Sequence, residues 1–514
     1  MSGILRLADL LGGLSMVADY GFGLPPGTAV RTGLVAAALG RRMGLADGEV
    51  RDGLYTGLLM HVGCVGISHE SAAVFGDDIR FYRAVTGTDV NDPDDVATVL
   101  DEVTRGMPAD AAVRTTSFLR TRGLEWARRA DTGVCEVARD TARRLGLSES
   151  TQQALYHVYE TWAGGWVPHG LKGDDIAVAS RVARASMEVA FFSQLGGADA
   201  AVAALRKRAG GLLDPAVVAA FTADPHGILA ELDQGDPHEL MLSAEPEPVL
   251  VRNASDLAEV AAAFGDLADV KMPFLHGHSR RVAELASGGA RRLGLGAAEV
   301  RRIEVAGLMH DVGRVGVSNA VWEKRGPLTR MEWEQVRMHG YYSERIVATS
   351  PSLAPLAPLV GMHHERLDGS GYHRCCTAAG IPMGARLVGV ADAFAAMLQP
   401  RPHRPALSVE QAVDALNADT AAGRFDHDAA VAVLAEAGHR VPRPRRSRPA
   451  GLSDREVEVL GLIAAGCSNA EVARRLVISR RTAEHHAQHI YAKIGVSTRA
   501  AAALFAVQHD LVRP

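Results

Sequence analysis

The stretch RRLGLGAAEVRRIEVAGLMHDVGRVGVS, residues 291–318, decides the fold because a related version occurs earlier in the chain. Residues 41–68, RRMGLADGEVRDGLYTGLLMHVGCVGIS, align with it without a gap, at a constant offset of 250, and 14 of the 28 positions are identical. Self-similarity at a fixed spacing is the sequence sign of a repeated structural unit. We therefore predict a duplicated helical domain; the alternative is a chance similarity between Ala-, Gly- and Leu-rich helices.

A second similarity supports the duplication. YETWAGGW from Tyr159 resembles HERLDGSG from His364, and each is followed by a Gly-Ile-Pro-like turn and an Ala/Val-rich helix. The separation is 205 residues here, so the loops between the two motifs differ in length. We place the first copy at residues 1–235 and the second at 250–438.

Two proline-containing segments separate these blocks from each other and from the C-terminus. Residues 233–250 are acidic with three prolines, and residues 439–450 are rich in Arg and Pro. Proline interrupts helices, so both segments are predicted to be extended, solvated connectors. The basic linker would tether the last block, residues 451–514, and its five arginines would add non-specific phosphate contacts.

The composition is that of a soluble globular protein of the mainly α class, with 47% hydrophobic and 22% charged residues among 514. Five scattered cysteines without CxxC spacing argue against a disulfide framework and favour a reducing compartment. Neither a signal peptide nor an apolar span of 18 residues is evident, so we expect a cytoplasmic protein without membrane contact.

The charge is unevenly distributed. Residues 439–514 contain 13 Lys/Arg and 6 Asp/Glu, whereas the rest of the chain contains 42 and 54. A basic terminal block on an acidic body points to a nucleic acid partner, although a merely solvated basic tail would give the same balance.

The last block is predicted to form four short helices between residues 451 and 508. Ser453 with Glu456, and Ser468 with Glu471, have the spacing of capping boxes. A three-residue turn at 477–479 follows, with Ser479 as the N-cap of the next helix. One face of that helix is apolar, formed by Ala483, Ala487, Ile490 and Ile494.

Two helices joined by a tight turn, with a polar second helix, have the geometry for insertion into the major groove. The block resembles the LuxR/NarL-type helix-turn-helix family over its whole length. The likeness is carried by Leu452-Ser453-x-Arg455-Glu456-x-Glu458-Val459-Leu460, by Ala465-Gly466-x-Ser468-Asn469-x-Glu471-Val472-Ala473, and by Leu476, Ser479, Thr482, Glu484, His486, Ile490, Lys493, Gly495-Val496 and Arg499.

This resemblance implies contacts with double-stranded DNA by a homodimer on paired half-sites. Phosphates would be bound by Arg480, Arg481, Thr482 and Lys493, and base edges would be read by Glu484, His485 and Gln488. His486 is expected to be a packed structural histidine. A protein-interaction helical bundle is the alternative for this block.

The central block concentrates His and Asp at His278, His310-Asp311, His339, His363-His364 and Asp392. A single buried histidine is usually a satisfied core residue. Five histidines with two aspartates in apolar helical sequence are harder to explain, because each unsatisfied buried polar group costs about 1–3 kcal/mol. A metal cluster removes that cost by taking their lone pairs.

Residues 270–435 resemble HD-type metal-dependent phosphohydrolases, specifically the HD-GYP subfamily. The matching segments are GHSRRVAELA, AGLMHDVGRVGVSNAVWEKRGPLTRMEWEQVRMHGYYSERI, MHHERLDGSGYHR and GIPMGARLVGVADAFAAM. The resemblance implies one divalent metal on His278, His310, Asp311 and Asp392, and a second on His339, His363, His364 and the bridging Asp311. Fe or Mn is expected, and Phe274 stands where some relatives carry a Glu for a third ion.

Asp311 and Arg314 would then act in catalysis, with Arg314, Gly371 and Tyr372 binding substrate. Two motifs depart from the family pattern: HDVGR has Arg314 where Lys is usual, and Gly371-Tyr372-His373 lacks the proline of GYP. Arginine keeps the charge and can bind phosphate in a bidentate manner. The implied function is a DNA-binding regulator whose phosphodiesterase domain hydrolyses or senses a nucleotide such as cyclic di-GMP. The alternative is an inactive HD domain for ligand sensing and dimerisation.

The first copy has lost every ligand that can be aligned. His310-Asp311 falls on Met60-His61 and His278 on Thr28, while the second offset places Val158-Tyr159 and Met187 opposite His363-His364 and Asp392. We expect this copy to serve as a sensor, a ligand pocket or a dimerisation platform, with His61 a core or surface histidine.

Overall fold

The computed structural model describes residues 3–89, 91–439, 449–509 and 511. The chain forms two compact units, residues 1–440 and 441–514. The predicted boundary at 235–250 falls inside the first unit and stays a prediction. Most of the predicted basic linker, residues 440–448 with its five arginines, lies outside the described residues.

Helices dominate the described residues, which confirms the mainly α class. The strands in this part of the chain are β1 (Ile4–Arg6) and β2 (Val251–Asn253), which pair antiparallel with Ile4 opposite Asn253. This small ribbon joins the start of the first copy to the start of the second.

The helices of the first copy run in the following order. They are α1 (Leu7–Leu14), α2 (Met16–Phe22), α3 (Thr28–Arg42), α4 (Asp47–Leu59), η1 (Val62–Ile67), α5 (Ser68–Phe75), α6 (Asp78–Val85), α7 (Pro93–Thr104), α8 (Ala109–Arg144), α9 (Glu149–Tyr156), η2 (Gly173–Asp175), α10 (Val178–Arg208), α11 (Pro215–Ala223), α12 (Pro225–Leu232) and α13 (Pro237–Ala244).

The second copy continues the first unit. Its helices are η3 (Ala254–Asp256), α14 (Leu257–Val270), η4 (Pro273–Leu275), α15 (His278–Arg292), α16 (Ala297–Met309), η5 (Val312–Gly316), α17 (Asn319–Trp322), α18 (Arg330–Thr349), η6 (Ala354–Leu356), α19 (Ala357–Gly361), η7 (Ala378–Gly380), α20 (Met383–Met397), α21 (Val409–Ala421) and α22 (His427–Glu436).

The element bounds repeat with the offsets seen in the sequence. Helices α3 and α4 begin and end 250 residues before α15 and α16, and α10 begins 205 residues before α20. Side chains repeat as well: the Glu160 carboxylate accepts the N–H groups of residues 169 and 171, and the Glu365 carboxylate those of residues 374 and 376. The two copies therefore share local hydrogen bonding as well as helices.

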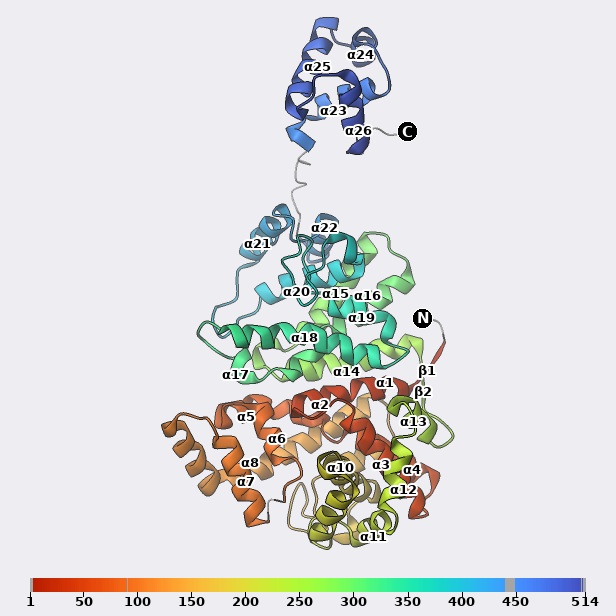
Figure 1. The fold of residues 1–514 in the computed structure, drawn as a ribbon, viewed down its shortest axis with the longest axis vertical. Helices are drawn as coiled ribbons and strands as arrows, with labels where there is room; N and C mark the ends of the chain where they lie inside the picture. The colour runs from red at the N-terminus through yellow and green to blue at the C-terminus, as the bar shows by residue number, and fades with distance from the viewer. Residues whose placement is uncertain (1–2, 90, 440–448, 510, 512–514) are drawn as a thin grey trace. The chain divides into compact units, whose positions relative to one another are not determined.

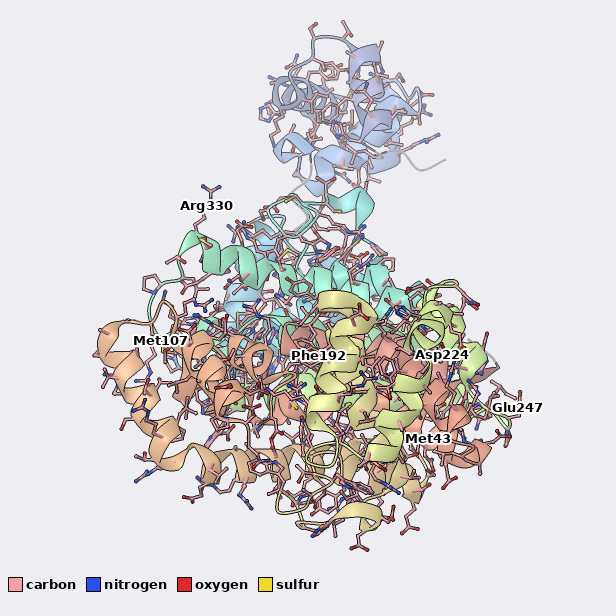
Figure 2. The ribbon with its side chains drawn as sticks, turned by 60° about the horizontal axis from the view of Figure 1, so that its bottom comes forward. Met43, Met107, Phe192, Asp224, Glu247 and Arg330 are labelled. Carbon is pink, nitrogen blue, oxygen red and sulfur yellow. The ribbon has the colours of Figure 1, made fainter. Side chains whose placement is uncertain are left out.

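The copies pack against each other through equivalent elements. Helix α2 contacts η5 of the second copy, α14 contacts η1 of the first, and α1 packs on α18. Figure 1 shows α1 and α2 lying along α14 and α18. The Tyr20 and Tyr342 rings contact each other across this interface, with centroids 4.6 Å apart and their planes tilted by 31°. Figure 2 shows the side chains, with Arg330 at the start of α18 projecting away from the ribbon.

The segment at 233–250 is folded, so the prediction of an extended connector is wrong. Helix α13 lies within it, with Pro237 in its first turn, and the Asp236 carboxylate caps it by accepting the N–H groups of His238 and Glu239. Proline is tolerated at the first helical position because its missing N–H would be unpaired there anyway. Met241 is fully buried, which anchors the helix.

The second unit confirms the predicted four helices. After η8 (Pro449–Gly451) come α23 (Asp454–Ala464), α24 (Asn469–Leu476), α25 (Arg480–Ile494) and α26 (Arg499–Gln508). Both capping boxes form, Val477 takes the left-handed conformation that ends α24, and the Ser479 side chain caps α25. Ala483, Ala487 and Ile490 are buried in this unit's core.

Two parts of the described residues have the length and hydropathy of a membrane span. One is Asp47–Phe75, and 61% of its most apolar part is buried inside the first unit. The other is α25 with α26 taken together, and these bend by 63°. The first stretch coincides with α4, η1 and α5, which are core elements of the repeat.

Candidate metal centre

Helix ends and helix interiors both contribute to the candidate centre. His278 is the first residue of α15, and His310 and Asp311 lie where α16 passes into η5. His339 and Asp392 stand inside α18 and α20, and His363 and His364 follow α19. Five separate segments of the second copy thus converge on one point.

Two glycines allow the backbones to come close enough. A Cβ at Gly313 would collide with the carbonyl of His339 and the backbone of Ser343, so only glycine lets η5 lie directly on α18. A Cβ at Gly389 would collide with the His363 carbonyl in the same way. These contacts hold His339 and His363 next to the segments that carry Asp311 and Asp392.

The structure brings all seven predicted side chains together in two groups that share Asp311. In each group one ligand atom from every residue lies within 4.8 Å of the others. In the first, the Nε2 atom of His278 is 3.0 Å from Asp392 Oδ1 and 3.6 Å from Asp311 Oδ2. His310 Nε2 is 2.9 Å from Asp311 Oδ2.

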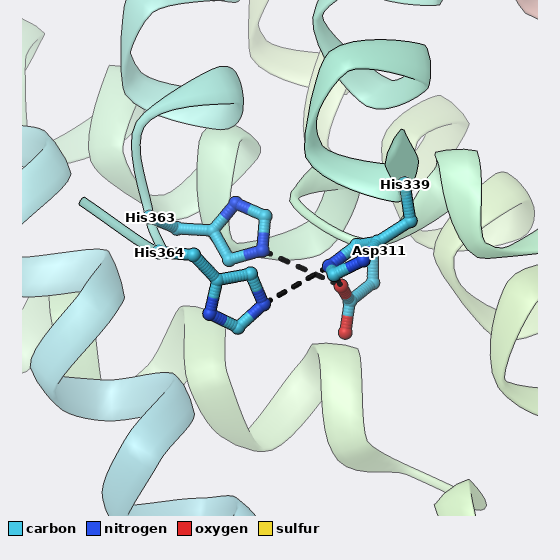
Figure 3. A group of neighbouring side chains, drawn as sticks. All are labelled: Asp311, His339, His363 and His364. Carbon is cyan, nitrogen blue, oxygen red and sulfur yellow. Dashed lines mark hydrogen bonds and ion pairs between the residues drawn. The ribbon is translucent and has the colours of Figure 1, made fainter. Parts of the chain in front are cut away.

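The second group is drawn in Figure 3. The Nε2 atoms of His339 and His363 each lie 3.5 Å from Asp311 Oδ1. His364 Nε2 is 2.9 Å from His339 Nε2. The His364 Nδ1 atom lies 3.8 Å from Oδ2 of Asp392, a residue of the first group. Asp311 therefore presents one carboxylate oxygen to each group.

Hydrogen bonds from the rear fix how three of the imidazoles point. The Nδ1 atoms of His310, His339 and His363 contact the carbonyls of Gly307, Val336 and Val360, respectively, at 2.7, 2.5 and 2.6 Å. A carbonyl can only accept, so each Nδ1 carries a proton and each Nε2 points towards the centre. This is the arrangement that orients metal-ligating histidines.

Several buried polar atoms of these residues lack a well-aligned hydrogen bond within the described residues, namely His278 Nδ1, His310 Nε2, His363 Nε2 and both oxygens of Asp311. The contacts of Asp311 there are ion pairs with Arg314 and the surrounding histidines. An unpaired buried polar group is costly, and an imidazole and carboxylate donor set suits first-row transition metals. The residues present therefore fit a metal centre.

Electrostatic coupling in the centre is strong. Burial works against protonation of His310, but the neighbouring carboxylates of Asp311 and Asp392 raise its pKa to about 10. Burial likewise works against ionisation of Asp311, yet Arg314 and His310 hold its pKa well below the usual range. Asp311 is thus a carboxylate, and a metal ion held here would take the place of the proton that the carboxylates favour on His310.

Arginines supply positive charge at the edge of the centre. Arg314 Nη2 lies 2.7 Å from Asp311 Oδ2, and its guanidinium stands over the Trp322 ring. Burial and then Arg314 lower the pKa of Arg401 to about 10. Sequence reasoning did not identify Arg401, because it lies in the loop between α20 and α21 without a motif, and the fold alone brings its charge under the influence of Asp392 and Asp311.

The Gly371-Tyr372 turn covers the His364 side of the centre. The Tyr372 ring stacks on His364 with centroids 4.7 Å apart. Glu365 holds the residues that follow, through N–H groups of Arg374 and Cys376. These two hydrogen bonds hold the turn at the place where the sequence has His373 instead of proline.

The predicted DNA-contacting residues lie on α25. Arg480, Arg481, Thr482, His485 and Gln488 are exposed, whereas Glu484 and His486 are half-buried. Arg480 pairs with Glu484 at 3.1 Å. Lys493 pairs with Glu456 at 2.7 Å, so its ammonium is bound within the unit.

The first copy lacks the donor set. Gly63 approaches Val134 and Ala138 as Gly313 approaches His339 and Ser343, so Val134 stands where His339 would be. That position could not be aligned from sequence, because the loops before it differ in length.

Two models of known protein families match this chain, one in each compact unit. The HD domain model matches residues 263–429, and the model of bacterial regulatory proteins of the luxR family matches residues 450–506. The 3'3'-cGAMP-specific phosphodiesterase 3 of Vibrio cholerae is 29% identical over 418 residues, which cover 79% of this chain and 89% of that protein.

Two further relatives extend this result. A cyclic di-GMP phosphodiesterase of Thermotoga maritima is 34% identical over 158 residues, or 30% of this chain and 43% of that protein. The crystal structure of a cyclic GMP-AMP-specific phosphodiesterase of V. cholerae matches with a TM-score of 0.59 and 25% identity, over 86% of this chain and 99% of that one. The match to this crystal structure is longer than the second copy and the C-terminal unit together, so it includes part of the first copy.

Proposed function

We propose that this chain, which carries an HD domain and a luxR-family regulatory domain, is a cytoplasmic transcription regulator that hydrolyses a cyclic dinucleotide. The observation that carries the proposal is the pair of buried ligand groups sharing Asp311. The relatives named above act on cyclic GMP-AMP or cyclic di-GMP, which supports this substrate class. The proposed domains are residues 1–235, 250–438 and 451–514, with the basic linker at 439–450.

The residues have separate tasks in this scheme. His278, His310 and Asp392 would hold one divalent ion and His339, His363 and His364 the second, with Asp311 bridging. Two bound metals would neutralise charge on the phosphodiester and lower the pKa of water. Arg314 and Arg401 would bind the phosphate, and Tyr372 would contact the substrate beside His364.

The test begins with the metal content of the purified full-length chain. We expect about two Fe or Mn ions per chain, and metal-dependent opening of 3'3'-cGAMP or cyclic di-GMP to linear products. Chelation should abolish the activity and re-addition should restore it. A protein that binds no metal after reconstitution would contradict the proposal.

One observation favours a second function, in which the HD domain binds ligand without turnover. Arg314 forms an ion pair with Asp311, where the family usually has lysine. Guanidinium is a planar, always charged group that holds a carboxylate tightly. Bound metal together with tight cyclic dinucleotide binding, and no product after long incubation, would support this function.

For the second unit we propose sequence-specific binding to double-stranded DNA as a homodimer. The exposed polar face of α25 supports this assignment, because a helix after a tight turn can enter the major groove. In this arrangement Arg481 contacts phosphate and Gln488 reads a base edge.

Two substitutions on α25 should affect DNA binding in different ways. Arg481→Ala should weaken binding to all sequences. The slope of the logarithm of the binding constant against the logarithm of the salt concentration should become shallower by about one. Gln488→Ala should weaken binding to the cognate site about tenfold and leave non-specific binding unchanged. Fluorescence anisotropy at several salt concentrations, on sites selected from a random pool, measures both effects.

The matched controls are Gln508→Ala on α26 and Arg330→Ala on α18, both exposed in the structure. Neither should change affinity. Equal behaviour of Gln488→Ala and Gln508→Ala would exclude base reading by α25.

A further inference from the structure

The first copy contains a cavity of about 130 Å³. It lies among α2, α6, α8, α10 and the loop after α9, and aromatic rings form much of its wall. Those used below are Tyr82, Trp126, Tyr159 and Trp166. An apolar cavity of about 150 Å³ holds benzene, so this slightly smaller space takes about one six-membered ring, and the rest of a larger ligand would lie in its opening.

This cavity occupies the place of the metal centre in the other copy. Among its lining residues His61 corresponds to Asp311, Val134 to His339, Tyr159 to His364 and Met187 to Asp392. The donor set has been replaced by rings and apolar side chains, yet the space has not been filled. A copy kept only for packing would gain stability by closing it.

Polar groups in the wall lack partners. His61 is 9% exposed, and both of its ring nitrogens are buried without a hydrogen bond in the described residues. Burial and then the charge of Arg184 lower the pKa of His61 to about 3, so the ring is neutral and offers one donor and one acceptor. The Arg184 Nε atom is also buried and unpaired within the described chain.

The cavity wall also contains one carboxylate, that of Asp131. Trp166 donates its indole N–H to Asp131 Oδ2 at 2.9 Å, and within the part of the chain that the structure describes no hydrogen bond reaches Oδ1. Asp131 and Trp126 retain partial exposure. The wall is therefore open to solvent at these residues, so a ring inside could carry a substituent that stays outside.

We propose that this cavity is a binding site for a guanine-type base, presented as a nucleoside or as part of a guanine nucleotide. Guanine carries two adjacent N–H donors on one edge, which suit the Asp131 carboxylate. Its O6 and N7 acceptors suit an arginine, here Arg184, and a base can stack on aromatic rings such as Tyr82 and Tyr159. Adenine lacks the paired donors that match a carboxylate.

Titration of the full-length chain with guanosine tests the site. Guanosine has no phosphate, so the HD centre offers it no metal-directed contact. We expect one guanosine per chain by calorimetry, with a change in tryptophan fluorescence from Trp126 and Trp166. Adenosine should bind at least tenfold more weakly. GMP should bind as well as guanosine or better if the base directs recognition.

Single substitutions in the full-length chain test whether guanosine binds in this cavity. Asp131→Asn still accepts the Trp166 hydrogen bond but should weaken guanosine binding at least tenfold, and Ala130→Phe should block the cavity. Asp140→Asn, on the exposed face of the same helix, should change nothing. The same affinity is expected in an Asp311→Asn chain, so loss of phosphodiesterase activity leaves this result intact.

Three outcomes would overturn the proposal. These are no guanosine binding at millimolar concentration, equal affinity for adenosine, and binding that Asp311→Asn removes while Asp131→Asn does not.

Discussion

Asp311→Asn should remove both metal ions and lower phosphodiesterase turnover by about 10³-fold or more. Asp311 is the residue common to both ligand groups, with one oxygen facing each of them. A carboxamide has the same shape but carries no charge and offers only one acceptor oxygen. His339→Ala should remove one ion of the two, because His339 belongs to a single group.

Metal analysis of the two variants beside the wild type therefore distinguishes a bridging ligand from a ligand of one site. Asp419→Asn is the matched control, since Asp419 is a half-exposed carboxylate of the same domain that pairs with Arg424. It should keep full metal content and activity. Equal metal loss in Asp311→Asn and His339→Ala would contradict the bridging role, and thermal unfolding in chelator checks that both variants fold.

The sequence predicted those features that depend on local patterns. Capping boxes at Ser453 and Ser468 define helix starts from four residues each, and both form. The gapless repeat predicted that the same helical unit occurs twice, and α3 and α4 do recur as α15 and α16 at the offset of 250 residues. The seven predicted His and Asp side chains come from helices, helix ends and the turn after α19, and they meet in one place.

Features that depend on tertiary contact could not be predicted. Helix α13 forms with Pro237 in its first turn because Asp236 caps it and Met241 is buried, and the burial of Met241 depends on the neighbouring helices. Arg401 lies in a loop without a motif, yet its charge is coupled to those of Arg314, Asp392 and Asp311. His61 looked like an ordinary core histidine, yet its nitrogens are unpaired and line a cavity.

A buried ion pair between the copies leads to a large effect on stability. Lys271 Nζ, at the end of α14, lies 2.5 Å from Asp78 Oδ2 at the start of α6, and both side chains are 0% exposed. Asp78 Oδ1 accepts hydrogen bonds from Ser318 Oγ and the Asn319 N–H, at 2.9 and 2.8 Å. One carboxylate therefore joins the first copy to two segments of the second.

Asp78→Ala should lower the free energy of unfolding of the first unit by about 3–5 kcal/mol, because it leaves the Lys271 ammonium buried without a counter-charge. Urea unfolding followed by circular dichroism measures this. Asp78→Leu combined with Lys271→Met should recover much of the loss, since an apolar pair avoids the cost of burying two charges. Asp110→Ala, which breaks the exposed pair with Arg114, is the control and should not change stability measurably.

The same variants test whether the first copy supports the metal centre. Ser318 and Asn319 follow η5, the segment that begins directly after Asp311 and carries Arg314. If the Asp78 carboxylate holds this segment in place, Asp78→Ala should lower metal affinity. The double variant Asp78→Leu with Lys271→Met should restore stability but not the hydrogen bonds to Ser318 and Asn319, so its metal affinity should stay low. Metal affinity that follows stability in both variants would contradict a specific role for those hydrogen bonds.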